Sequence, residues 1–179
     1  MRRTSLSVLL LLAACQRADA PSSSSSGREA GAPAATGLER AAIESGVIAD
    51  AAKLSPVGVY QRRHEAGRDA LCVIPDKSGD FRFGTEADFG EEQSCRGHGT
   101  ARRAGDKLIL SFSGGDHCII VAQYDGDQLS LPGVVDMKCA SVCEGRGSLE
   151  GVSFPRIAGD AAAALRALDS KGNPLCDPD

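Results

Sequence analysis

Between residues 57 and 131 the chain contains short segments in which apolar and polar positions alternate with a period of two, among them 57–60, 70–74 and 81–83. That period sets one side of a segment against a core and the other in water, which is typical of half-buried β-strands. Turn-forming residues separate the segments, as at 75–80 and at Asp125-Gly126, a pair that favours tight hairpins. The pattern predicts a mainly β (α+β) fold, a small antiparallel meander that closes into a barrel or sandwich.

The predicted strands are short and closely spaced. They cover residues 57–60, 70–74, 81–83, 95–103, 108–112, 118–124 and 128–131, with 149–154 as a candidate for a last strand. The charged residues 62–69 are interpreted as the loop of a hairpin, because no apolar face runs through them.

Helical patterns lie on either side of this β region. Apolar residues recur at the spacing of one helical face, which predicts a helix over 38–53; they are Ile43, Val47, Ala51 and Leu54. Glycine inside a helix costs about 1 kcal/mol relative to alanine, so the helix is expected to break at Gly46 into two pieces. Asp160 is a suitable N-cap for a second, shorter helix over 161–168.

The first 36 residues differ in composition from the rest. Residues 1–14 carry two arginines, an apolar run and small residues, which predict a secretory signal peptide. The apolar run is far shorter than the roughly 20 residues that a membrane-spanning helix needs. Residues 15–36 begin with a cysteine and continue as a Ser-, Pro-, Gly- and Ala-rich stretch, typical of a flexible linker. Residues 37–179 are then expected to form a single β-rich globular domain.

The predicted signal peptide ends in Leu12-Ala13-Ala14-Cys15. This tetrapeptide resembles the lipobox of bacterial lipoproteins. The resemblance implies that Cys15 becomes the first residue of the mature chain and carries a diacylglycerol and an N-acyl chain such as palmitate. Two or more chains attach a protein firmly to a membrane. Residue 16 is glutamine rather than aspartate, which in that family favours the outer membrane, on its periplasmic side.

Six further cysteines belong to the predicted domain. An even number in an exported chain predicts three disulfides, and six cysteines allow 15 connectivities. The preferred pairing is Cys72 with Cys176, Cys95 with Cys118, and Cys139 with Cys143. The first bond would hold the C-terminal tail to an early strand, the second would join neighbouring hairpins, and the third would close a local loop.

Charge and composition exclude one class of partner. The sequence has a net charge of −4, and loss of Arg2 and Arg3 with the signal peptide would leave 18 basic and 24 acidic residues. A chain of this sign is not expected to bind nucleic acid. It has no tryptophan, five phenylalanines and two tyrosines, so platforms for stacking bases or sugars are few.

No sequence motif predicts a catalytic residue, a metal or a cofactor. The sequence lacks a Gly-x-Ser-x-Gly nucleophile elbow and a phosphate-binding glycine motif. Ser113, Asp116 and His117 lie within one turn and are interpreted as a loop rather than a triad. Zinc held by Cys95, Cys118 and their neighbouring histidines is the alternative to disulfides, and an oxidising compartment favours the disulfides.

One arginine stands out as a candidate contact. Gly145-Arg146-Gly147 follows Cys143 closely and is interpreted as a turn fixed by the neighbouring cysteine pair. The sharper hypothesis is that this rigid loop holds Arg146 outward to bind an anionic partner.

Several motifs occur in a recognisable order: Gly46-Val47-Ile48-Ala49-Asp50, Pro56-Val57-Gly58-Val59-Tyr60, Cys72-Val73-Ile74-Pro75 and Cys139-x-x-x-Cys143-x-Gly-Arg-Gly-Ser-Leu. This layout resembles that of small lipobox-bearing envelope lipoproteins of Gram-negative bacteria, and the resemblance implies no catalytic residue. A looser likeness, in architecture and location only, is to lipoprotein-type lysozyme inhibitors.

The sequence therefore predicts an outer-membrane-anchored envelope lipoprotein that is a binding or structural module and not an enzyme. Its expected partners are the membrane, through the lipid on Cys15, and an envelope protein. The most specific form of this hypothesis is that the protein inhibits a peptidoglycan hydrolase. Two alternatives stay open. A small-molecule carrier would have an apolar cavity inside the barrel, and an envelope hydrolase would have a pocket with convergent titratable groups.

Overall fold

The computed structural model describes residues 37–114 and 116–176. This part of the chain contains eight strands, two α-helices and two short 3₁₀ helices, none of the helices being long and apolar enough to cross a bilayer. In chain order the elements are α1 (Gly37–Glu44), η1 (Ala51–Lys53), β1 (Gly58–His64), β2 (Gly67–Pro75), β3 (Phe81–Asp88), β4 (Ser94–Ala104), β5 (Lys107–Phe112), β6 (Ile119–Tyr124), β7 (Gln128–Ser130), η2 (Met137–Val142), β8 (Ser153–Ala158) and α2 (Ala161–Leu165).

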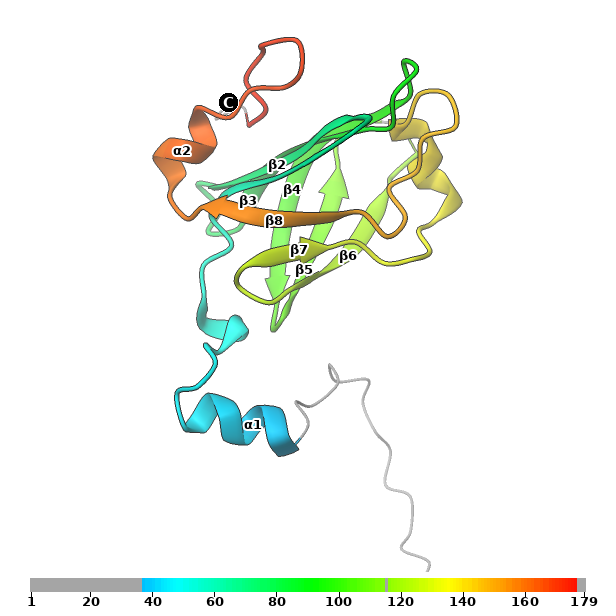
Figure 1. Cartoon of the computed structure of the whole chain (residues 1–179). Helices are drawn as coiled ribbons and strands as arrows, with labels where there is room; N and C mark the ends of the chain where they lie inside the picture. The colour runs from blue at the N-terminus through cyan, green and yellow to red at the C-terminus, as the bar shows by residue number, and fades with distance from the viewer. Residues whose placement is uncertain (1–36, 115, 177–179) are drawn as a thin grey trace, which may run out of the picture. The chain divides into compact units, whose positions relative to one another are not determined.

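The eight strands form one closed antiparallel barrel (Figure 1). Each strand pairs with the next one in the sequence, and β8 returns to β1 through the pairs Val59–Ala158 and Tyr60–Arg156. Closure leaves no strand edge unpaired, and exposed edges are where β proteins aggregate. The predicted fold class, a mainly β antiparallel barrel with a helix before it and a short helix after it in the sequence, is confirmed.

The inward-facing residues of the strands fill the barrel. Along β6 the side chains are alternately exposed and buried, as the period-two pattern predicts. Phe83 and Phe112 meet edge to face in the interior, with their ring centres 4.9 Å apart. The largest other side chains of this core are Tyr60, Leu71, Leu108, Leu110, Ile120, Tyr124, Leu129 and Phe154. Close packing of these side chains holds the strands in one register.

A second apolar layer lies outside the barrel, on β1 and β2. Val59, Ala70, Cys72 and Ile74 pack there against α2 and the C-terminal tail, and the predicted disulfide between Cys72 and Cys176 joins the two. The helix α2 begins as predicted, because the Asp160 carboxylate accepts a hydrogen bond from the backbone N–H of Ala163 (2.7 Å).

The helix α2 ends at Leu165, three residues earlier than predicted. The backbone N–H of Leu175 donates to the carbonyl of Ala167 (2.8 Å), and Leu168 pairs with Pro174. The chain therefore leaves the helix to pair with its own tail, a long-range contact that local propensity does not reveal.

The hairpin between β1 and β2 is longer than the sequence predicts. Residues 62–69, interpreted above as a loop, continue both strands up to a two-residue turn. Asp69 is 1% exposed, and its carboxylate accepts hydrogen bonds from Arg62 Nη2 (2.5 Å) and Nε (3.1 Å) and lies 3.0 Å from His64 Nε2. Ion pairs rather than apolar side chains hold these strand ends together. The pattern of apolar residues therefore could not predict them.

Two other boundaries follow from local geometry. The helical segment predicted over 38–53 is broken as expected, because Gly46 takes a left-handed φ of 73° between α1 and η1. The candidate strand at 149–154 lies instead at 153–158, since Leu149 and Val152 are buried by the loop that precedes β8.

Arg156 on β8 reinforces the closure of the barrel. The pairings β6–β7, β7–β8 and β8–β1 comprise only two, three and two residue pairs. The Arg156 guanidinium donates to the carbonyls of Val57 (2.7 Å) and Gly126 (3.0 Å) and to the hydroxyl of Tyr124 (3.0 Å). One side chain thus connects β8 with the approach to β1 and with the β6–β7 turn.

We expect Arg156→Lys to lower the free energy of unfolding by about 2 kcal/mol, because an ammonium lacks the planar fork that reaches three acceptors. Urea denaturation of the oxidised protein measures this loss. Arg102→Lys is the matched control, an exposed β4 arginine for which we expect a change within about 0.5 kcal/mol. Equal stability of the two variants would contradict the role given to Arg156.

Candidate functional site

Two of the three disulfides differ from the predicted pairing. The structure joins Cys95 to Cys143 and Cys118 to Cys139, so the predicted bonds Cys95–Cys118 and Cys139–Cys143 are wrong. The strand β5 lies between β4, which carries Cys95, and β6, which follows Cys118. Cys139 lies in η2 and Cys143 just after it, and each sulfur bonds to a different segment of the barrel.

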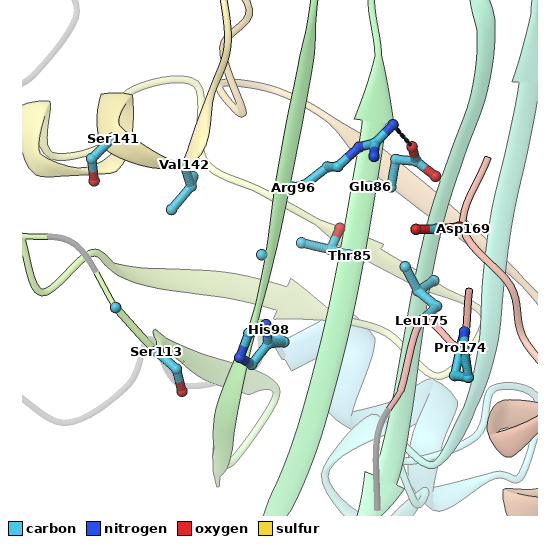
Figure 2. A pocket seen from close by; sticks show the side chains of 12 residues that line it. Thr85, Glu86, Arg96, His98, Ser113, Ser141, Val142, Asp169, Pro174 and Leu175 are labelled. Carbon is cyan, nitrogen blue, oxygen red and sulfur yellow. Dashed lines mark ion pairs between the residues drawn. The ribbon is translucent and has the colours of Figure 1, made fainter. Parts of the chain in front are cut away.

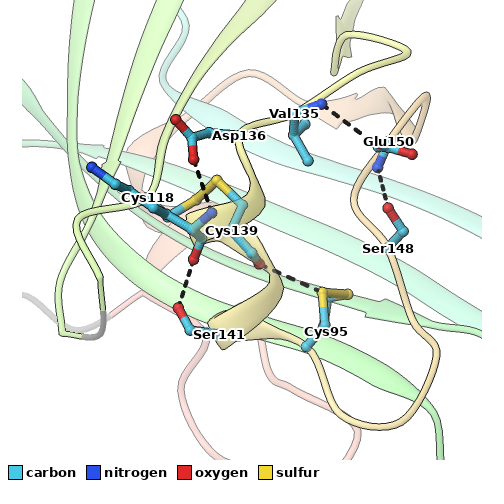
Figure 3. The surroundings of a disulfide bond; sticks show 10 residues. Cys95, Cys118, Val135, Asp136, Cys139, Ser141, Ser148 and Glu150 are labelled. Carbon is cyan, nitrogen blue, oxygen red and sulfur yellow. Dashed lines mark hydrogen bonds between the residues drawn. A yellow bond between two sulfur atoms is a disulfide. The ribbon is translucent and has the colours of Figure 1, made fainter.

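These two disulfides fasten η2 to the barrel (Figure 3). The Asp136 carboxylate caps the first turn by accepting from the backbone N–H of Lys138 (2.9 Å), and Ser141 Oγ donates to the Lys138 carbonyl (2.8 Å). A six-residue 3₁₀ helix has poor hydrogen-bond geometry by itself. The two disulfides and the cap therefore hold η2 in place on the barrel surface.

Arg146 lies on the loop that follows η2. The loop starts at Cys143, and the backbone N–H of Glu144 donates to the Ser94 carbonyl of β4 (2.7 Å). Arg146 is exposed, and within residues 37–114 and 116–176 its side chain has no hydrogen bond or ion pair. A disulfide holds the base of this loop, although Cys95 and not Cys139 is the partner of Cys143.

A polar groove lies next to η2, over the outer face of β3 and β4 (Figure 2). It consists of two adjoining cavities of about 360 and 480 Å³, which share His98, Ser113, Pro174 and Leu175. The C-terminal tail forms one wall, and the first cavity reaches Ser141 and Val142 of η2 on the other side. The three disulfides therefore fix both walls of this groove.

A buried ion pair lies in the first cavity. Glu86 on β3 is 1% exposed and lies opposite Arg96 of β4 in the strand register, with Arg96 Nη2 2.6 Å from Glu86 Oε1. The backbone N–H and the hydroxyl of Ser170 both donate to the Glu86 carboxylate (2.7 Å each). Arg96 Nε is buried and has no partner among the described residues.

Asp169 adds a second carboxylate to the same cavity. Loss of surrounding water works to raise its pKa, but hydrogen bonds from Asn173 and Lys171 outweigh this and lower the pKa below the ordinary value of an aspartate. The cavity thus holds two carboxylates and one guanidinium side by side.

Close packing at Gly84 holds the tail wall in place. A Cβ built on Gly84 would lie 1.7 Å from the carbonyl oxygen of Leu175, so the tail lies directly on bare strand backbone. No side chain other than hydrogen fits at this position.

The groove contains histidine and serine side chains, His98, Ser113 and Ser141. Catalysis by a serine requires a hydrogen bond between the nucleophile and its base. Among the described residues, the backbone N–H of Ser113 donates to the carbonyl of His98 (2.8 Å), but no hydrogen bond joins the His98 side chain to the hydroxyl of Ser113 or Ser141. No three His, Cys, Asp or Glu side chains of these residues converge as metal ligands would. The sulfurs of Cys95 and Cys118, weighed above as zinc ligands, belong to disulfides.

The remaining sequence candidate, Cys15, lies outside the described residues. No known protein family, curated protein or solved structure matches this chain.

We expect Gly84→Ala to displace the C-terminal tail and to destabilise the protein by about 1–3 kcal/mol, because the added methyl overlaps backbone that cannot rotate away. The Cys72–Cys176 bond should then be reduced faster by dithiothreitol, as followed by mass spectrometry of alkylated peptides. Gly133→Ala is the control, since a Cβ at Gly133 meets nothing within 4 Å. Equal rates of reduction in the two variants would refute the close packing of the tail.

Proposed function

We propose that this chain is a lipid-anchored binding module of the bacterial cell envelope, attached to the outer membrane through Cys15. One observation carries the binding role. Arg146 is exposed, has no partner within the described residues, and lies on a loop whose base is fixed by the Cys95–Cys143 disulfide. A loop that is already fixed loses little conformational entropy on binding. Most of the free energy of a contact made by Arg146 would therefore contribute to the affinity.

A peptidoglycan hydrolase is the partner class that such an arginine suits best. Most glycosidases carry two carboxyl groups about 5–10 Å apart in a cleft, and this pair is a strong local acidic feature. An arginine fork binds a carboxylate through two parallel hydrogen bonds. A projecting Arg146 that enters the cleft would both hold the enzyme and obstruct its substrate.

The two alternative functions receive less support from the geometry. A carrier that holds its ligand inside the barrel needs an interior cavity, whereas packed side chains occupy the interior that the structure describes. An envelope hydrolase needs a nucleophile and a base in contact, and His98 has no such partner in the described part of the groove.

The oxidised protein should inhibit a lysozyme-type muramidase, and Arg146→Ala should weaken the inhibition at least about tenfold, since a charge-assisted pair is lost. Clearance of a cell-wall suspension at increasing inhibitor concentration measures this. Arg102→Ala is the matched control, because Arg102 is also exposed and lies on strand β4. If the wild-type protein and the Arg146→Ala variant inhibit equally, or if neither does, the proposed contact is wrong.

We expect Cys15→Ser to release the protein from the membrane fraction of a Gram-negative host, because the acylated thiol is the proposed attachment. Fractionation followed by immunoblotting, with labelled palmitate as a second readout, tests the anchor separately from the binding role. Retention of the unlabelled variant in the membrane would argue against lipid attachment at Cys15.

A further inference from the structure

A second groove, separate from the Arg146 loop, lies between α2 and the outer face of the barrel. Its volume is about 390 Å³, and it is lined by residues of β1, β2, β8, α2 and the segment after α2. Figure 1 shows α2 beside the ends of β8 and β2. Ala163 and Ala167 line this space from the helix side, and Val59 and Ala70 form its floor on the barrel.

The groove has an apolar surface that is still open to water. Ile157 of β8 and Leu168 line it and are 59% and 47% exposed. Large apolar side chains gathered at one concave place are typical of ligand sites, and a volume of this size lies in the usual range for such sites.

The charged side chains that line the groove are both arginines, Arg68 and Arg166. Arg63 lies directly opposite Arg68 in the register of β1 and β2, on the same outer face of the sheet. Like charges in such a pair destabilise a sheet. Within the described residues, Arg68 Nη2 donates only to the Leu168 carbonyl (2.7 Å), and Arg63 and Arg166 have no side-chain partner.

No carboxylate among the described residues lines this groove, and two acidic groups next to α2 in sequence are engaged elsewhere. Asp160 caps the first turn of α2 through the backbone N–H of Ala163. Asp169 accepts hydrogen bonds from the backbone N–H groups of Lys171 and Asn173 (2.9 and 2.8 Å). None of the three arginines forms an ion pair within the part of the chain that the structure describes.

We propose that this groove binds a single-chain anionic amphiphile. Arg68 and Arg166 hold the head group, a carboxylate or a phosphodiester, because the guanidinium fork matches the paired oxygens of either. The acyl chain lies along Ile157 and Leu168, whose exposed apolar surface it covers. This site is independent of the proposed function, because none of its residues belongs to the Arg146 loop or to the anchor.

Displacement of a fluorescent fatty acid, dansyl-undecanoate, from the oxidised full chain carrying Cys15→Ser tests the proposal without detergent. Palmitate and lysophosphatidylglycerol, each below its micellar concentration, represent the two anionic head groups, and monopalmitoylglycerol is the neutral control of equal chain length. We expect both anionic compounds, or one of them, to displace the probe at least about tenfold better than the neutral one.

Two variants of exposed residues locate the site. Arg166→Gln and Ile157→Asp should each weaken binding of the probe at least about tenfold, and Arg102→Gln, on β4, should not. Unchanged binding by both variants, equal displacement by the neutral compound, or binding of the probe only to mixed vesicles would overturn the proposal. Inhibition of a muramidase by the Arg166→Gln variant should equal that of its parent, so failure of this site and failure of the Arg146 contact are distinguishable.

Discussion

Closure of the meander by β8 is the constraint on which the rest of the structure depends. An open sheet of this sequence would expose the apolar face of every strand and two unpaired edges. The closing pairs are few, and the half-buried guanidinium of Arg156 supplies hydrogen bonds that the short strands cannot. This one side chain therefore supports the barrel where its strand pairing is shortest.

The disulfides act on the outside of the barrel. Each of them attaches a segment outside the strands to the barrel. Cys176 attaches the C-terminal tail, and Cys139 and Cys143 attach η2 and the residue that follows it. The Arg146 loop and the walls of the polar groove belong to these outer segments. The barrel core thus supplies stability, while the disulfides give fixed positions to surface segments that would otherwise fray.

The sequence predicted those features that depend on local pattern. Alternation located the central strands, Asp160 marked the start of α2, and Gly46 marked the break after α1, because each of these effects acts within a few residues. It missed the strand ends at Arg62 and His64, where a buried Asp69 compensates for missing apolar residues.

Arg146 could be singled out from its own Gly-Arg-Gly turn, but the two grooves were beyond the reach of sequence pattern, since each combines distant segments. Glu86 meets Arg96 only through the register of β3 and β4. The partners of Cys95 and Cys118 depend on where η2 lies, which no spacing reveals.

The pairing of the cysteines has a consequence for how the protein acquires its bonds. The pairs are nested, with sequence separations of 21, 48 and 104 residues, so each bond encloses the one before it. In a compartment that receives the chain from its N-terminus, Cys72 and Cys95 arrive before their partners and can pair wrongly with each other. Formation of the inner bonds first favours the correct pairing, because each inner bond shortens the loop that the next bond must close. Maturation of this protein is therefore expected to depend on thiol reshuffling as well as on oxidation.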